Sequence, residues 1–108
     1  MSVQMLLVSF KFNISPAEYR QAIKPLVSDI LNAPGLRWKI WLINELEYVA
    51  GGVYLFDDAL SVQLFLASPL MERLKNHPTF ANFRVMPFDV LDVETMLTHG
   101  PIGKGVRV

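Results

Sequence analysis

The residues LRWKIWLINE at positions 36–45 and YVAGGVYLF at positions 48–56 decide the fold of this chain. Both runs are rich in β-branched and aromatic residues, and they predict two strands of one hairpin with its turn near 44–47. A sheet with one face in water alternates apolar and polar residues, but these runs are apolar on both sets of alternate positions. We therefore expect something to cover each face of this hairpin.

The composition fits one small domain with more apolar surface than a monomer usually carries. The chain has 108 residues, 52% of them hydrophobic, which predicts an oligomer. It has no cysteine, so disulfides and thiolate sites are excluded. Ten basic residues balance ten acidic ones, so no long-range field attracts nucleic acid or an anionic membrane. The apolar start lacks a basic leader and is too short to span a bilayer, and we expect a cytoplasmic protein.

Alternation, helix caps and prolines predict the remaining elements. Ser15-Pro16-Ala17-Glu18 has the pattern of a helix start with a capping box. The predicted elements outside the hairpin are a strand at 3–12, a helix from Pro16 to Leu31, two short helices beginning after Asp57-Asp58 and Ser68-Pro69, and a strand at 80–90 with Pro87 at an edge or bulge. This β-α-β-β-α-β order predicts an α+β fold, the ferredoxin-like antiparallel sheet with its helices on one face. We expect one domain over 1–108, with a core at 1–94 and an extended tail at 95–108.

The bare face of this sheet is where we expect function. The helix-covered face is expected to hold Leu6, Val8, Phe10 and Phe12 from the first strand, Trp38, Ile40 and Leu42 from the second, and Val49, Val53 and Leu55 from the third. The bare face is expected to hold Leu7, Ser9, Lys11, Lys39, Trp41, Ile43, Tyr54 and Phe56. Gly51-Gly52 predicts a bulge or a close backbone approach within the third strand.

Several segments resemble the YdhR-like mono-oxygenases, which are similar to the wider dimeric α+β barrel superfamily with its antibiotic-biosynthesis mono-oxygenases. The segments are FKFN at 10–13, KPLVSDI at 24–30, PGLRWKIW at 34–41, AGGVYLF at 50–56 followed by Asp57, and Phe88-Asp89-Val90. The resemblance spans roughly Leu6 to Leu97. It implies a homodimer whose sheets enclose a barrel-like interior, and an oxygenase activity with no metal, haem or flavin as cofactor.

Within that framework, Trp41, Tyr54 and Asn44 are the candidate catalytic residues. Trp41 offers a stacking surface, Tyr54 a hydroxyl and Asn44 an amide that orients a carbonyl; the alternatives are an aromatic dimer core and an ordinary turn residue. Lys39 is expected either to stabilise a phenolate or to extend along the cavity rim. The expected substrate-binding set is Leu7, Ser9, Lys39, Trp41, Ile43, Tyr54 and Phe56.

The sequence leaves the activity open. One hypothesis is a cofactor-independent mono-oxygenase acting on a small aromatic or quinol-like molecule between helix-free sheet faces. A second is a homodimer that binds a small apolar or aromatic ligand without catalysis, and a third is an isomerase or decarboxylase on the same fold. His77 and His99 lack carboxylates at ligand spacing, so no metal site is expected.

Overall fold

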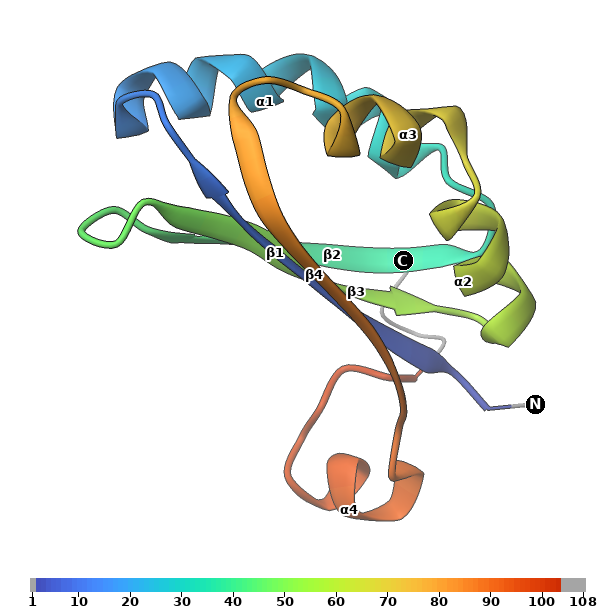
Figure 1. The fold of residues 1–108 in the computed structure, drawn as a ribbon. Helices are drawn as coiled ribbons and strands as arrows, with labels where there is room; N and C mark the ends of the chain where they lie inside the picture. The colour runs from blue at the N-terminus through green and yellow to red at the C-terminus, as the bar shows by residue number, and fades with distance from the viewer. Residues whose placement is uncertain (1, 104–108) are drawn as a thin grey trace.

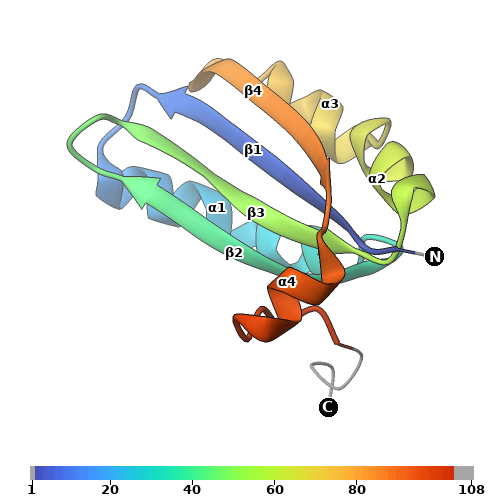
Figure 2. The same cartoon turned by 90° about the horizontal axis from the view of Figure 1, so that it is seen from below.

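A computed structural model, which describes residues 2–103, shows a four-stranded antiparallel sheet with three helices on one face. The ferredoxin-like prediction is confirmed: these helices lie above the sheet in Figure 1, and the strands lie in the order β2-β3-β1-β4, as Figure 2 shows. The elements are β1 (Gln4–Phe12), α1 (Pro16–Leu31), β2 (Leu36–Asn44), β3 (Val49–Phe56), α2 (Ala59–Leu66), α3 (Pro69–Lys75), β4 (Phe80–Asp89) and α4 (Asp92–Leu97). No helix in the described part of the chain is long and apolar enough to cross a membrane.

The helices begin where the local sequence indicates. The Ser15 hydroxyl accepts a hydrogen bond from the Glu18 amide at 3.1 Å, and the Glu18 carboxylate accepts one from the Ser15 amide at 3.0 Å. Asp58 and Ser68 cap α2 and α3 in the same manner, each through its side-chain oxygen. These caps satisfy amides that the first turn of a helix leaves without partners, so short-range sequence is enough to place the helix starts.

The main core lies between the sheet and α1, α2 and α3. Leu6, Val8, Phe10 and Phe12 of β1 are buried in it, as expected. Tyr19 and Ile30 of α1 pack above them. Because alternate residues of a strand point to opposite faces, the neighbours of these four β1 residues lie on the other side of the sheet.

Of residues 2–103, only α4 and the segment that follows it lie on that other side, here called the open face (Figures 1 and 2). Pairing of the strands assigns to the open face Met5, Leu7, Ser9, Lys11, Trp38, Ile40, Leu42, Val53, Leu55, Arg84, Met86 and Phe88. Many of its apolar side chains are exposed, among them Ile40 at 51% and Met86 at 55%. One end of it is covered by a small cluster around Leu55 and Ile102.

The region after β4 differs from the prediction. The expected extended tail from residue 95 is wrong for 95–97, because these residues complete α4. The chain then returns to the sheet, where the Trp38 indole donates a hydrogen bond to the Pro101 carbonyl at 2.8 Å. Residues 104–108 of the expected tail lie outside the described residues.

Candidate active site

A bulge at Arg37 decides which face of the sheet the side chains of β2 occupy. Leu36 pairs with Phe56, but Trp38 pairs with Leu55, so Arg37 is one extra residue in the ladder. Since such a shift moves every later side chain to the opposite face, Lys39 lies on the helix-covered side, next to its partner Tyr54.

The predicted faces of β2 are therefore wrong, and those of β3 are wrong because its regular pairing with β1 places Tyr54 opposite the buried Leu6. Lys39, Trp41, Tyr54 and Phe56 lie under the helices, and Trp38, Ile40, Leu42, Val49, Val53 and Leu55 lie on the other side. In both strands the two sets of alternate residues are apolar apart from Lys39. The charge of Lys39 led to the prediction that its set lies on the helix-free face. A regular ladder from the buried Leu36 would have placed Trp38 under the helices, as predicted.

The irregularities of the sheet lie away from Gly51-Gly52. At these glycines β3 pairs with both neighbouring strands without a shift in register. Besides the bulge at Arg37, the register shifts once more, between β1 and β4 opposite Phe10, where Asn82 has a φ of 57°. The predicted bulge is thus wrong, and the alternative of a close backbone approach is confirmed. A Cβ on Gly51, whose φ is 151°, would lie 1.9 Å from the Val8 carbonyl oxygen.

Gly52 makes room for the side chain of Lys39. A Cβ at this position would lie 2.5 Å from Cε of Lys39 and 2.8 Å from the carbonyl oxygen of Ile40. The missing side chain of Gly52 leaves the path along which the lysine stem crosses from β2 toward the ring of Tyr54. The glycine pair therefore serves two contacts, one with β1 and one with the candidate site.

The amine of Lys39 is held between two aromatic rings. Its Nζ lies 3.3 Å from the centroid of the Trp41 ring and 4.5 Å from that of Tyr54. Among residues 2–103 it has neither a hydrogen-bond nor an ion-pair partner. Burial lowers the pKa of Lys39 to about 7. Ring faces stabilise an ammonium by about 0.5–2 kcal/mol, which opposes this effect without cancelling it. Part of the amine is therefore neutral near neutral pH and able to accept a proton.

Two tyrosines near the amine stay protonated. Burial raises the pKa of Tyr19 to about 12, and burial followed by the neighbouring Tyr19 raises the pKa of Tyr54 further. Both phenols are consequently proton donors rather than bases at physiological pH. Tyr54 is held by ring contacts with Phe56 and Phe65, at centroid distances of 6.0 and 5.0 Å.

A small cavity adjoins the lysine and an open groove lies beside it. The cavity is about 20 Å³, room for a molecule the size of water, and it is lined by Lys39, Trp41 and Tyr54 with apolar residues of β1, α1 and α3. The groove is about 220 Å³ and runs between α1 and the edge strand β2, with Arg20 and Ile43 in its wall. Tyr19, Ile23 and Trp41 line both spaces. They form the partition between a solvent-open groove and the lysine.

The structure brings only part of the predicted site together. Lys39, Trp41 and Tyr54 form one cluster, and Ile43 lies at the adjoining groove. Phe56 is fully buried in the core. The other three predicted residues lie elsewhere: Leu7 and Ser9 on the open face, and Asn44 at the hairpin turn, where its side-chain oxygen accepts a hydrogen bond from the Glu47 amide at 3.1 Å.

Sequence analysis missed Tyr19, Ile23 and Gly52 as parts of this site. Tyr19 and Ile23 belong to the apolar stripe of α1, and no local signal separates cavity wall from core. Gly52 is unusual within a strand, but the sequence does not indicate its partner across the strands. Among the described residues, no group of three His, Asp or Glu side chains is placed to hold a metal ion.

Comparison with known proteins supports the fold and the family. A family model described as "Putative mono-oxygenase ydhR" matches residues 5–101. Protein SO0527 from Shewanella oneidensis has a similar structure, with a TM-score of 0.68 and 14% identity over 82% of this chain and 91% of that chain. A mutant of SnoaB, a cofactor-independent oxygenase from Streptomyces nogalater, has a TM-score of 0.67 and 14% identity over 84% of this chain and 95% of that chain.

A protein from Chloroflexus aurantiacus described as a putative antibiotic biosynthesis monooxygenase gives a TM-score of 0.63 and 15% identity over 83% of this chain and 94% of that chain. At these identities the structural likeness concerns the fold alone. A comparison with curated proteins gave no match.

Proposed function

The chain belongs to the YdhR mono-oxygenase family, and we propose that it oxygenates a small electron-rich aromatic molecule, a phenol or quinol, without a metal, haem or flavin. The observation that supports this most is the desolvated amine of Lys39 against the rings of Trp41 and Tyr54. A phenol must lose its proton before it can reduce oxygen readily. A neutral amine in an apolar site can accept that proton, and the ammonium formed then stabilises the phenolate.

In this proposal the substrate enters the groove between α1 and β2 and stacks on Trp41. Movement of the Trp41 ring joins the groove to the small cavity and exposes the amine of Lys39. The phenolate carbon then attacks molecular oxygen, and cleavage of the resulting peroxide, with protons from Lys39 and solvent, leaves a carbonyl and water. The apolar walls keep bulk water from the charged intermediate.

The reaction balances without a further reductant when the substrate is a hydroquinone. One hydroquinone and one molecule of oxygen give one hydroxyquinone and one water. One oxygen atom enters the ring as the new substituent, and the other leaves as water. The substrate supplies all four electrons that reduce the oxygen, so the proposal needs no flavin or metal to store them.

Oxygen uptake tests the activity. A panel of hydroquinones and phenols is supplied with the purified chain and a chelator, with no added flavin or metal. The proposal expects uptake with labelled oxygen entering the product as one atom, and a rate that rises with pH through about 7 as Lys39 loses its proton.

Lys39→Met is the decisive variant. It should lower kcat/KM about 100-fold or more, a typical loss for an acid–base group. Lys24→Met, an exposed change on α1, is the matched control and should leave the rate unchanged. Absence of uptake above background across the panel, or full activity of Lys39→Met, would refute the proposed role.

Ligand binding without catalysis is the second candidate. It is favoured by the missing hydrogen-bond partner of Lys39 among the described residues, since an assembled acid–base pair would normally hold one. Native mass spectrometry of gently purified protein should then reveal a co-purified aromatic molecule that Trp41→Ala no longer retains, with no product formed.

We further propose that two copies form a homodimer through their open faces. Leu7, Ile40, Leu42, Met86 and Phe88 expose 39–55% of their surface on this face. Apolar patches of this kind on small proteins commonly mark interfaces. Light scattering at micromolar concentration should report about twice 12.3 kDa, and a stable monomer would refute the dimer without affecting the site under the helices.

A further inference from the structure

The two spaces beside Lys39 carry a cationic side chain at each end. Arg20 of α1 lies in the wall of the groove between α1 and β2, and the amine of Lys39 lies at the small cavity behind that groove. Tyr19, Ile23 and Trp41 line both spaces and separate the two cations. Of residues 2–103, no carboxylate lines either space. This arrangement is complementary to a flat molecule that is apolar in the middle and carries negative charge at its two ends.

The guanidinium of Arg20 already holds a carboxylate at the edge of the groove. Its Nη2 lies 2.5 Å from Oε2 of Glu45, which belongs to the turn after β2. The two side chains are 57% and 47% exposed, and ion pairs with this much exposure contribute little to stability. Glu45 can therefore be replaced by another carboxylate at little cost.

A carboxylate carried by a ring in the groove would be bound more tightly than the one at the turn. Guanidinium groups hold carboxylates through two parallel N–H···O bonds, which favours a planar acid with a fixed direction. Inside the groove the acid would also lie against the apolar side chains of Ile23 and Ile43, where water screens the ion pair less. Stacking of its ring on Trp41 would hold it there.

The size of the groove favours a ligand with a single ring. Its volume of about 220 Å³ is below the roughly 300–1,000 Å³ of pockets for drug-sized ligands. The cavity behind it adds about 20 Å³. One benzene ring with short substituents suits these dimensions, whereas a fused polycyclic molecule would extend beyond the groove.

We propose that the groove takes an aromatic acid, a phenol or hydroquinone whose ring carries a carboxylate. Arg20 binds that carboxylate in exchange for Glu45, and the phenolic hydroxyl is directed toward Lys39. This substrate class rests on the proposed function and makes Arg20 a residue that determines specificity. The carboxylate takes no part in the oxygenation, so the balance given above for a hydroquinone is unchanged.

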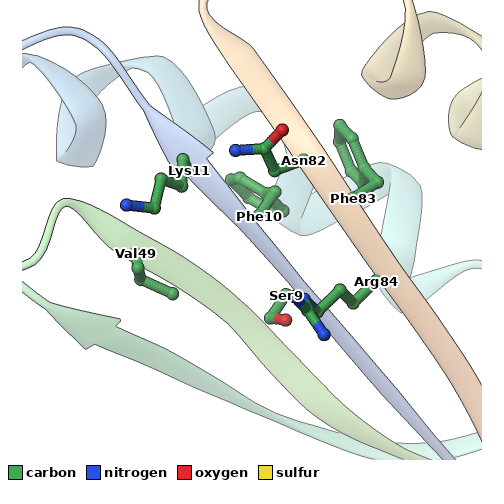
Figure 3. A pocket seen from close by; sticks show the side chains of 7 residues that line it. All are labelled: Ser9, Phe10, Lys11, Val49, Asn82, Phe83 and Arg84. Atoms are coloured by element: carbon green, nitrogen blue, oxygen red, sulfur yellow. The ribbon is translucent and has the colours of Figure 1, made fainter.

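A second cationic hollow in the described chain is a competing place for a carboxylate. Lys11 and Arg84 flank about 390 Å³ on the open face, beside Ser9 and Asn82 (Figure 3). This hollow lies on the other side of the sheet from Lys39, so an acid bound there would leave its ring away from the amine. The variant Arg84→Gln therefore distinguishes the two sites.

Binding measured without oxygen tests the substrate class apart from catalysis. Isothermal titration calorimetry under argon, at neutral pH and low salt, gives the dissociation constants of gentisate, a hydroquinone with one ring carboxylate, and of its neutral amide. The amide should bind about fivefold more weakly than the acid, the upper range for a partly exposed ion pair. Arg20→Gln should bring this ratio to about one without changing the binding of the amide. Glu45→Gln should raise the ratio about twofold or more, because it removes the carboxylate that competes for Arg20.

Two further variants serve as controls. Arg73→Gln is the matched one, since it removes an exposed helical arginine whose guanidinium lies 3.6 Å from the carboxylate of Asp29. It should leave the ratio unchanged, and so should Arg84→Gln. A ratio near one in the original chain, a ratio that survives Arg20→Gln or falls in Glu45→Gln, or a ratio lost in Arg84→Gln would overturn the assignment.

Oxygen uptake separates this result from the proposed function. Uptake with hydroquinone but no preference for gentisate over its amide would refute the carboxylate site and leave the oxygenase. A preference that depends on Arg20, with no uptake across the panel, would support the binding of an aromatic acid and refute the oxygenation. Absence of binding by both gentisate and its amide would overturn the proposed substrate class.

Discussion

Replacing Lys39 by methionine should remove a pH dependence from the stability of this protein. The folded pKa of Lys39 is about 7, against 10.5 for a free lysine, because burial disfavours the ammonium. Between these values the unfolded chain binds more protons than the folded one, so the free energy of unfolding rises with pH. The unfavourable contribution is complete below pH 7 and is relieved progressively as the pH increases toward 10.5.

The size of the effect follows from that interval. Each pH unit well inside it is equivalent to about 1.4 kcal/mol, and the onset near the folded pKa lowers the gain between pH 7 and pH 9 to about 2 kcal/mol. Stabilisation of the ammonium by the rings of Trp41 and Tyr54 lowers this gain in the free energy of unfolding to about 1.5 kcal/mol. Tyr19 and Tyr54 do not interfere in this range, because their pKa values are raised above the usual 10.

Urea unfolding at fixed protein concentration, followed by the fluorescence of Trp38 and Trp41, measures this difference. With a slope of about 1–2 kcal/mol per molar urea, the midpoint of the original chain should rise by about 1–2 M from pH 7 to pH 9. Lys39→Met should be the more stable protein at pH 6, and its advantage should shrink by about 1.5–2 kcal/mol at pH 9. Lys24→Met should follow the original profile. Parallel profiles for the original chain and Lys39→Met would refute the claim that the amine is desolvated.

Three further changes probe the framework around the site. Gly51→Ala should destabilise the fold by about 3 kcal/mol in urea titrations, because its Cβ would meet the Val8 carbonyl; a loss below about 1 kcal/mol would contradict the close approach. Trp38→Phe should lose about 1 kcal/mol and increase amide hydrogen exchange in α4, since the bond to Pro101 is removed; unchanged exchange would show that this anchor is dispensable. Ser15→Ala should cost about 1 kcal/mol through the lost cap of α1, and Ser15→Asp should restore most of it.

The candidate site shows where sequence reasoning reached its limit. Lys39, Trp41 and Tyr54 are all conspicuous in the sequence, because a lysine among aromatic residues in a strand is unusual in any register. The predicted face of these three residues was wrong, since the pattern of β2 is apolar on both sides. A half-buried lysine under the helices also departs from the rule that charges lie outside, and sites that break local rules are often functional.

The helix starts, the order of elements and the inward face of β1 follow from the amino-acid sequence alone. Those features depend on neighbours within a few residues, such as Ser15 and Glu18, or on one clear alternation. The faces of β2 depended on the tertiary structure, because the bulge at Arg37 is held by Asp57 and Ile102, which are distant in the sequence. Those of β3 depended on its pairing with β1. One extra residue in the ladder carried Lys39 beneath the helices, and only those long-range partners decide that it is there.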